Sequence, residues 1–239
     1  MEPDRTGLSR RGELYLFAAM LVAALILSAV PVVRWPFSWM QTFFHEISHG
    51  LTAIATGGRI VAIELDWNGA GRCTTQGGIR LFVAFAGYAG AALWGGLIYA
   101  MVDHASPKSA NRIAMALAGL IVLTAALWAR DLTTWAILTI ILAPFALILL
   151  TRDRPIENYV VQFCGLYILV DAIRTPTYLI DGRDRGDGAT LQALTWLPEL
   201  FWVLTWLAIG ALTLVVLVRR HLRLDDSAAE PSSTQRTGK

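Results

Sequence analysis

The sequence predicts an all-α polytopic membrane protein with about six, and at most seven, transmembrane helices. Of the 239 residues, 55% are hydrophobic and only 16% are charged, against about 25% charged residues in a typical soluble domain. The apolar residues also gather in blocks of about 20, the length that a membrane-spanning helix needs. Arg and Lys collect at the ends of these blocks, as expected beside a membrane. Together these observations exclude a soluble globular fold.

Seven apolar segments can be marked along the chain, and the number that cross the membrane follows from their flanking charges. Basic residues before the first segment and after the last favour a cytoplasmic location for both ends, which requires an even number of crossings. Arg130-Asp131 alone separates the fourth segment from the fifth. We therefore expect one of these two to be short, tilted or re-entrant, and prefer six full crossings over seven. The segments are 14–33, 37–56, 81–102, 113–129, 131–150, 159–180 and 197–218.

The chain reads as one membrane domain, residues 14–222, with short polar ends. Residues 1–13 form an expected cytoplasmic segment, and residues 223–239 have the small, polar composition of a disordered tail. The first apolar block is longer than a usual signal-peptide core and lacks its exit motif, so we expect a retained helix. No basic patch interleaved with aromatic residues suggests a nucleic-acid partner. Two cysteines far apart, Cys73 and Cys164, suit neither a disulfide framework nor a cysteine-type zinc site.

A β-hairpin insert is predicted at about residues 59–76, between the second and third apolar segments. Gly57-Gly58 stops the preceding helix, and Ile60 to Trp67 then alternates between apolar and polar residues. Asn68-Gly69 is a strong two-residue turn signal, after which residues 70–76 can return as a second strand. Two roles remain open: a cap on the helix bundle, or a strand edge that holds an extended peptide. The residues expected on one face are Val61, Ile63, Leu65 and Trp67.

The chemistry concentrates in the second apolar segment, at His45-Glu46-Ile47-Ser48-His49. Residues four apart share one face of a helix, so both imidazoles can reach one metal ion, with Glu46 placed to act as general base on a metal-activated water. Zinc lowers the pKa of such a water to about 7. Ionisable groups at membrane depth are costly and usually mark functional sites. The motif therefore predicts a zinc site with His45 and His49 as ligands and Glu46 as the catalytic base.

A catalytic zinc site also needs a third protein ligand. Neither remaining histidine suits this role, because both lie in polar stretches (His104 and His221). A carboxylate is therefore expected. Asp171 is preferred because it is embedded in the apolar run 166–173, although it could instead pair with Arg174. Asp187 is the alternative, although an aspartate there could simply cap a helix, and Asp181 ranks third.

The buried motif, the glycine-rich hairpin and Phe85-Ala86-Gly87-Tyr88-Ala89-Gly90 resemble the site-2 protease family, and in particular its compact, peptidase M50B-like branch. The resemblance covers roughly residues 35–210. It implies an intramembrane zinc metallopeptidase with two histidine ligands, a catalytic glutamate and an aspartate from a later helix. The implied substrate is a membrane-anchored protein, cut in or near its transmembrane segment, and the implied location is the cytoplasmic membrane of a bacterium.

The sequence also departs from the pattern of that family. No Asn-Pro precedes a candidate aspartate, and the usual Gly-Pro of the third segment is Gly87-Tyr88 here. These departures leave the third ligand open. The alternative function is a metal-binding membrane protein without proteolysis, such as a transporter or an inactive scaffold. A transporter should show several polar residues along one path, and the apolar segments offer few.

Overall fold

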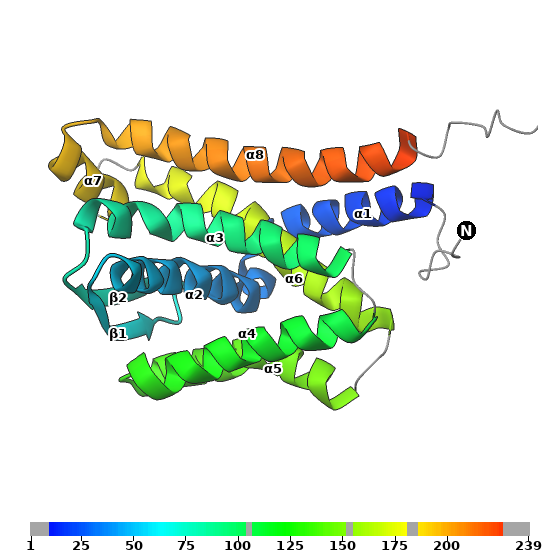
Figure 1. Cartoon of the computed structure of the whole chain (residues 1–239), viewed down its shortest axis with the longest axis horizontal. Coiled ribbons are helices and arrows are strands. Elements are labelled where there is room, and N and C mark those ends of the chain that lie inside the picture. The colour runs from blue at the N-terminus through cyan, green and yellow to red at the C-terminus, as the bar shows by residue number, and fades with distance from the viewer. Residues whose placement is uncertain (1–9, 104–106, 152–154, 181–185, 227–239) are drawn as a thin grey trace, which may run out of the picture.

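The computed structural model describes residues 10–103, 107–151, 155–180 and 186–226. Asp181, His104 and most of both the expected N-terminal segment and the expected tail lie outside these residues. Figure 1 shows a bundle of long helices with a small sheet near one end. In chain order, the elements are α1 (Arg10–Ala29), α2 (Pro31–Ala55), β1 (Arg59–Leu65), β2 (Gly71–Gln76), α3 (Arg80–Asp103), α4 (Pro107–Trp128), α5 (Leu132–Thr151), α6 (Pro155–Arg174), the 3₁₀ helix η1 (Thr175–Leu179), α7 (Asp187–Thr195) and α8 (Glu199–Asp226).

Among the described residues, six helices are long and apolar enough to cross a membrane: α1, α3, α4, α5, α6 and α8. They direct large apolar side chains outward, and Leu132, Leu147 and Leu150 are 88%, 61% and 82% exposed. In water such exposure would be costly, whereas lipid accepts it. The all-α polytopic class with about six spans is therefore confirmed.

The long helix that falls short as a span is α2, and the expectation that the fourth or fifth segment would be too short to cross is wrong. Both α4 and α5 qualify, whereas α2 carries the polar motif and does not. Figure 1 shows α1 and α2 following one another in the same direction along the bundle. The start of α1 and the end of α8 consequently lie at the same end of the molecule, as an even number of crossings requires.

The break between α1 and α2 lies at Val30, before the 33–37 boundary expected from the segments. Pro31 occupies the first position of α2, where a missing N–H costs nothing and the fixed φ suits a helix. Pro36 lies inside the same helix. The guanidinium of Arg174 on α6 donates a 2.5 Å hydrogen bond to the carbonyl of Ser28, which satisfies one of the free carbonyls at the end of α1.

The predicted hairpin is confirmed, although its turn is longer than expected. β1 pairs antiparallel with β2. The N–H of Asp66 donates to the carbonyl of Ala70 at 2.9 Å, and the N–H of Gly69 donates to the carbonyl of Asp66 at 3.0 Å. These bonds enclose a three-residue loop rather than a two-residue one, and Gly69 takes the positive φ of 86° that such loops require at their last residue.

The predicted apolar face is wrong at two positions: Val61 within β1, and Trp67 beyond the end of β1, which is also 43% exposed. The register shifts between Ile60 and Ala62, and this irregularity turns Val61 outward, leaving it 43% exposed, while Ile60 is buried. Beyond it, Ile63 and Leu65 are buried as expected. A bulge reverses the alternation of side chains locally, and the hydropathy pattern of the strand gave no sign of it.

The hairpin is fastened to two helices. The N–H of Leu65 donates to the hydroxyl of Thr134 on α5 at 2.9 Å, and that hydroxyl donates to the Asp131 carboxylate at 2.7 Å. At the turn, the hydroxyl of Thr42 on α2 donates to the carbonyl of Gly69 at 2.8 Å. The hairpin is thus held against the helix that carries the motif.

The central helix α3 packs most extensively against α6, and glycines allow the close approach. A Cβ atom on Gly95 would lie 2.5 Å from the backbone nitrogen of Leu169, and one on Gly165 would lie 2.7 Å from that of Tyr99. Small residues at helix contacts are the usual means of tight packing in membranes. This packing fixes α3, which forms one wall of the site described next.

Candidate metal site

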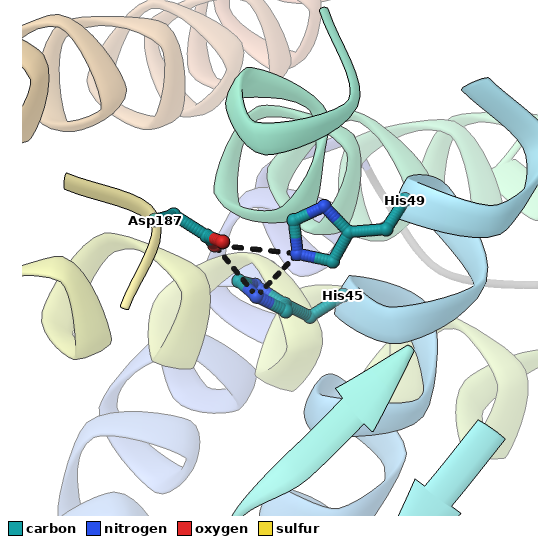
Figure 2. A group of neighbouring side chains, drawn as sticks. All are labelled: His45, His49 and Asp187. Atoms are coloured by element: carbon teal, nitrogen blue, oxygen red, sulfur yellow. Dashed lines mark hydrogen bonds and ion pairs between the residues drawn. The ribbon is translucent and has the colours of Figure 1, made fainter. Parts of the chain in front are cut away.

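Three side chains from distant parts of the chain converge on one point. The Nε2 atoms of His45 and His49 on α2 are 3.0 Å apart. The Asp187 Oδ2 atom lies 3.1 Å from His45 Nε2 and 3.2 Å from His49 Nε2. Figure 2 shows the two rings and the carboxylate directed toward one another. These three residues form a group that could hold a metal ion.

The ring of His49 is oriented by the backbone of α3. Its Nδ1 atom lies 2.6 Å from the carbonyl oxygen of Val83. With its proton on Nδ1, the ring donates a hydrogen bond to that carbonyl. The lone pair of Nε2 is then free to bind a metal ion and faces the other two candidate ligand atoms, His45 Nε2 and Asp187 Oδ2. Metal-binding histidines are usually fixed through their second nitrogen in this way. The ring of His45 is packed edge-on against Tyr88, with ring centroids 4.4 Å apart.

Asp187 reaches the histidines because it begins α7. Gly186 precedes it with a φ of 91°, a conformation that glycine adopts readily. A Cβ atom on Gly188 would lie 2.3 Å from a carboxylate oxygen of Glu199, so the start of α7 packs closely on the start of α8. Burial raises the pKa of the Asp187 carboxyl, but the side chains of His49 and His45 beside it outweigh burial and hold the pKa well below its ordinary value. Asp187 is therefore ionised at neutral pH, as a metal ligand must be.

Glu46 is buried, 5% exposed, and faces the hairpin strand β2. Its carboxyl group lies close to the backbone of Cys73. A Cβ atom on Gly71 would lie 2.6 Å from Glu46 Oε1, so only glycine leaves the room that this carboxylate occupies. Burial and the nearby Glu46 raise the pKa of the Cys73 thiol to about 12, which keeps it protonated at neutral pH and unsuited to bind zinc as a thiolate.

A cavity of about 540 Å³ opens onto the histidines, Glu46 and Asp187. Its walls come from α2, β2, α3, η1 and α7. Among the described residues, β2 has β1 as its one neighbour in the sheet, and residues of β2 line this cavity. Further residues that line it include Gln41, Arg72, Thr75, Arg80, Tyr178 and Thr190.

The structure places Asp171, the preferred third ligand, outside the group of His45, His49 and Asp187. Its carboxyl group lies near Ser38, close to the start of α2, and near the cations Arg174 and Arg34. Pairing with Arg174 had been the alternative role for this aspartate. The preference for Asp171 over Asp187 does not agree with this geometry, because the apolar setting of Asp171 marks burial and says nothing of the direction in which the side chain points.

The donor set fits zinc in number and spacing. Two imidazoles and a carboxylate are the ligands of many catalytic zinc sites, which keep a fourth position for water or substrate. Zinc bonds of about 2.1 Å in a tetrahedron place ligand atoms about 3.4 Å apart. The three donor atoms here are separated by 3.0 to 3.2 Å, so a small outward shift would admit the ion.

The fold and the site together define a multi-pass membrane protein with a metallopeptidase-type arrangement: a His-Glu-x-x-His helix, an aspartate from a later element and an adjoining cavity. The chain belongs to the Peptidase M50B-like family, a site-2 protease family whose model matches residues 17–217. No curated protein and no solved structure matches the chain.

Sequence reasoning identified His45, Glu46 and His49 and kept Asp187 as the alternative ligand. It gave no sign of the roles of Val83 and Gly71, which act through a backbone carbonyl and through the absence of a side chain. Such roles depend on which elements pack together, and no local residue pattern encodes them. The Gly87-Tyr88 departure was the one further signal, since both residues adjoin the histidines.

Proposed function

We propose that this protein is an intramembrane zinc endopeptidase that hydrolyses peptide bonds in or near the transmembrane segments of membrane-anchored proteins. His45, His49 and Asp187 would hold the zinc ion, and Glu46 would be the general base. The observation that carries the proposal is the convergence of Asp187 on the two motif histidines beside a cavity. Membership of a peptidase family supports it.

The hydrolysis requires two proton transfers, one from the attacking water to Glu46 and one from Glu46 to the leaving nitrogen. Zinc, when bound, supplies a Lewis acid that polarises the scissile carbonyl and lowers the pKa of water. Glu46 accepts a proton from the attacking water as its oxygen bonds to the carbonyl carbon. Glu46 then returns that proton to the amide nitrogen as the C–N bond breaks. The products are a carboxylic acid and an amine, and Glu46 regains its initial state.

The hairpin offers a place for the substrate chain. The backbone groups of a helical substrate are already hydrogen-bonded within the helix, so the segment must unwind before its peptide bonds can be attacked. Residues of β2 line the cavity, and the edge of β2 away from β1 could pair with an unwound segment by strand addition. In this proposal the hairpin has both of the roles that the sequence left open: it caps the helix bundle, and its strand edge holds the extended substrate chain.

Removal of the metal tests the proposed function. The purified protein, reconstituted in liposomes with tagged single-pass membrane proteins, is expected to cleave at least one of them. Dialysis against a chelator should abolish cleavage, and stoichiometric zinc should restore it, as followed by the size of the tagged fragments. Cleavage that survives with less than a tenth of a zinc ion per chain would rule out a zinc peptidase.

A further inference from the structure

A phenol, the side chain of Tyr88, stands beside the histidines. Tyr88 on α3 lines the cavity together with His45, Glu46 and Asp187. Its ring meets that of His45 edge-on, with centroids 4.4 Å apart. Gly87, the residue before it, is also in contact with both histidines. Tyr88 therefore adds a polar side chain from α3 next to the ring of His45, in addition to the other motif residues and Asp187.

The ring of Tyr88 is held from its other side. Trp206 on α8 lies with its ring centroid 4.8 Å from that of Tyr88. Trp206 is itself 1% exposed, and its indole N–H donates to the carbonyl of Phe85 at 3.0 Å. The phenol is thus clamped between the imidazole of His45 and a fixed indole. A clamped donor needs no reorganisation during a reaction, which is the condition for effective electrostatic catalysis.

The hydroxyl of Tyr88 lies among the carboxylates of the site and is free to bind a ligand. It interacts electrostatically with Asp187, Glu46 and Glu199. Within the part of the chain that the structure describes, it makes no hydrogen bond. It therefore keeps its proton available for a substrate.

Three neighbouring hydroxyls are already committed to the backbone. Thr42 donates to the carbonyl of Gly69, Ser48 to that of Phe44 and Thr190 to that of Gly186. A hydroxyl whose hydrogen is used in this way cannot also donate to a substrate. Tyr88 combines an uncommitted hydroxyl with a ring packed on a proposed zinc ligand.

We propose that Tyr88 is a further catalytic residue, which donates a hydrogen bond to the carbonyl oxygen of the scissile peptide bond as that oxygen gains negative charge. The inference rests on the proposed function. The neutral phenol acts only as a donor, and its proton stays on the hydroxyl. Loss of one such donor typically lowers kcat by about 10²- to 10³-fold.

Tyr88→Phe tests this role, because it removes the hydroxyl and keeps the ring between His45 and Trp206. We expect zinc content and KM to stay at wild-type values, while kcat falls about 10²-fold. A second measurement is independent of turnover: the affinity of the zinc-loaded protein for a phosphinic peptide built on the cleaved reporter sequence, whose tetrahedral phosphorus imitates the reacting carbon. This affinity should fall by a similar factor. Tyr99→Phe is the control, since Tyr99 lies on the same helix and packs against Phe17.

Three results would overturn the role of Tyr88. A Tyr88→Phe protein with wild-type kcat would show that the hydroxyl is not used. A fall in kcat with unchanged phosphinic peptide affinity, or with loss of zinc, would show that Tyr88 acts by positioning other groups. Cleavage by the wild type that is no faster than by Glu46→Gln would instead overturn the proposed function, and the role of Tyr88 with it.

Discussion

Glu46→Gln is expected to abolish peptide-bond cleavage while leaving one zinc ion per chain. The amide is close in size to the carboxylate but cannot accept a proton from water. General-base catalysis typically contributes about 10²- to 10⁴-fold to a rate, so residual cleavage should lie at least about 10²-fold below that of the wild type. Because Glu46 is not among the three converging donors, zinc content should not change. The rate of reporter cleavage and metal analysis of the same preparation check both statements.

Glu64→Gln is the matched control for this change. Glu64 lies on β1 and forms an ion pair with Arg72, with N and O atoms 2.5 Å apart; the Arg72 side chain is 73% exposed and that of Glu64 is 35% exposed. Exposed pairs of this kind contribute about 0 to 1 kcal/mol to stability, so this variant should fold and cleave nearly as the wild type does. Full activity of Glu46→Gln would show that another group removes the proton.

Gly87→Ala is expected to remove both zinc and activity. A Cβ atom at this position would lie 2.4 Å from His49 Nε2 and 2.6 Å from His45 Nε2, far inside van der Waals contact. The two imidazoles would have to move apart, and the three donors would no longer share one point. We expect less than about a tenth of the wild-type zinc content, because displaced ligands leave too few donors to hold the ion.

Gly119→Ala makes the same chemical change on α4, where nothing lies within 4 Å of the added atom. It should retain zinc and activity. Circular dichroism of both variants checks that the helices persist. A Gly87→Ala protein that kept wild-type zinc and cleavage would mean that the arrangement of His45 and His49 against α3 is wrong.

The fold class, the metal-binding motif and the hairpin could be predicted because each depends on a local pattern of residues. The fold class follows from the length and apolarity of the segments, which depend on composition alone. His45, Glu46 and His49 share one helix, so their spacing fixes their relation without any knowledge of the packing. The hairpin likewise follows from alternation and a turn signal. These features require only residues near one another in the chain.

Features that depend on packing were either missed or ranked second. Asp187 lies more than 130 residues after the histidines in the sequence and contacts them from the start of α7. This short helix lies outside all of the predicted apolar segments. Asp171 was preferred for its apolar surroundings, yet its side chain faces Ser38 near the start of α2. The bulge at Val61 also escaped prediction, because it reverses the exposure of a single residue. In each case the direction of a side chain was decided by elements distant in sequence.

The zinc content of Asp187→Ala, compared with that of Asp171→Ala, tests the central claim most directly. Both proteins are purified in parallel with the wild type, checked for helical content and measured by mass spectrometry for zinc per chain. We predict about one zinc ion in the wild type and in Asp171→Ala, and a loss of at least tenfold in Asp187→Ala, because only Asp187 adjoins both histidines. Wild-type zinc in Asp187→Ala, or its loss in Asp171→Ala alone, would contradict the assignment of His45, His49 and Asp187 as the metal site.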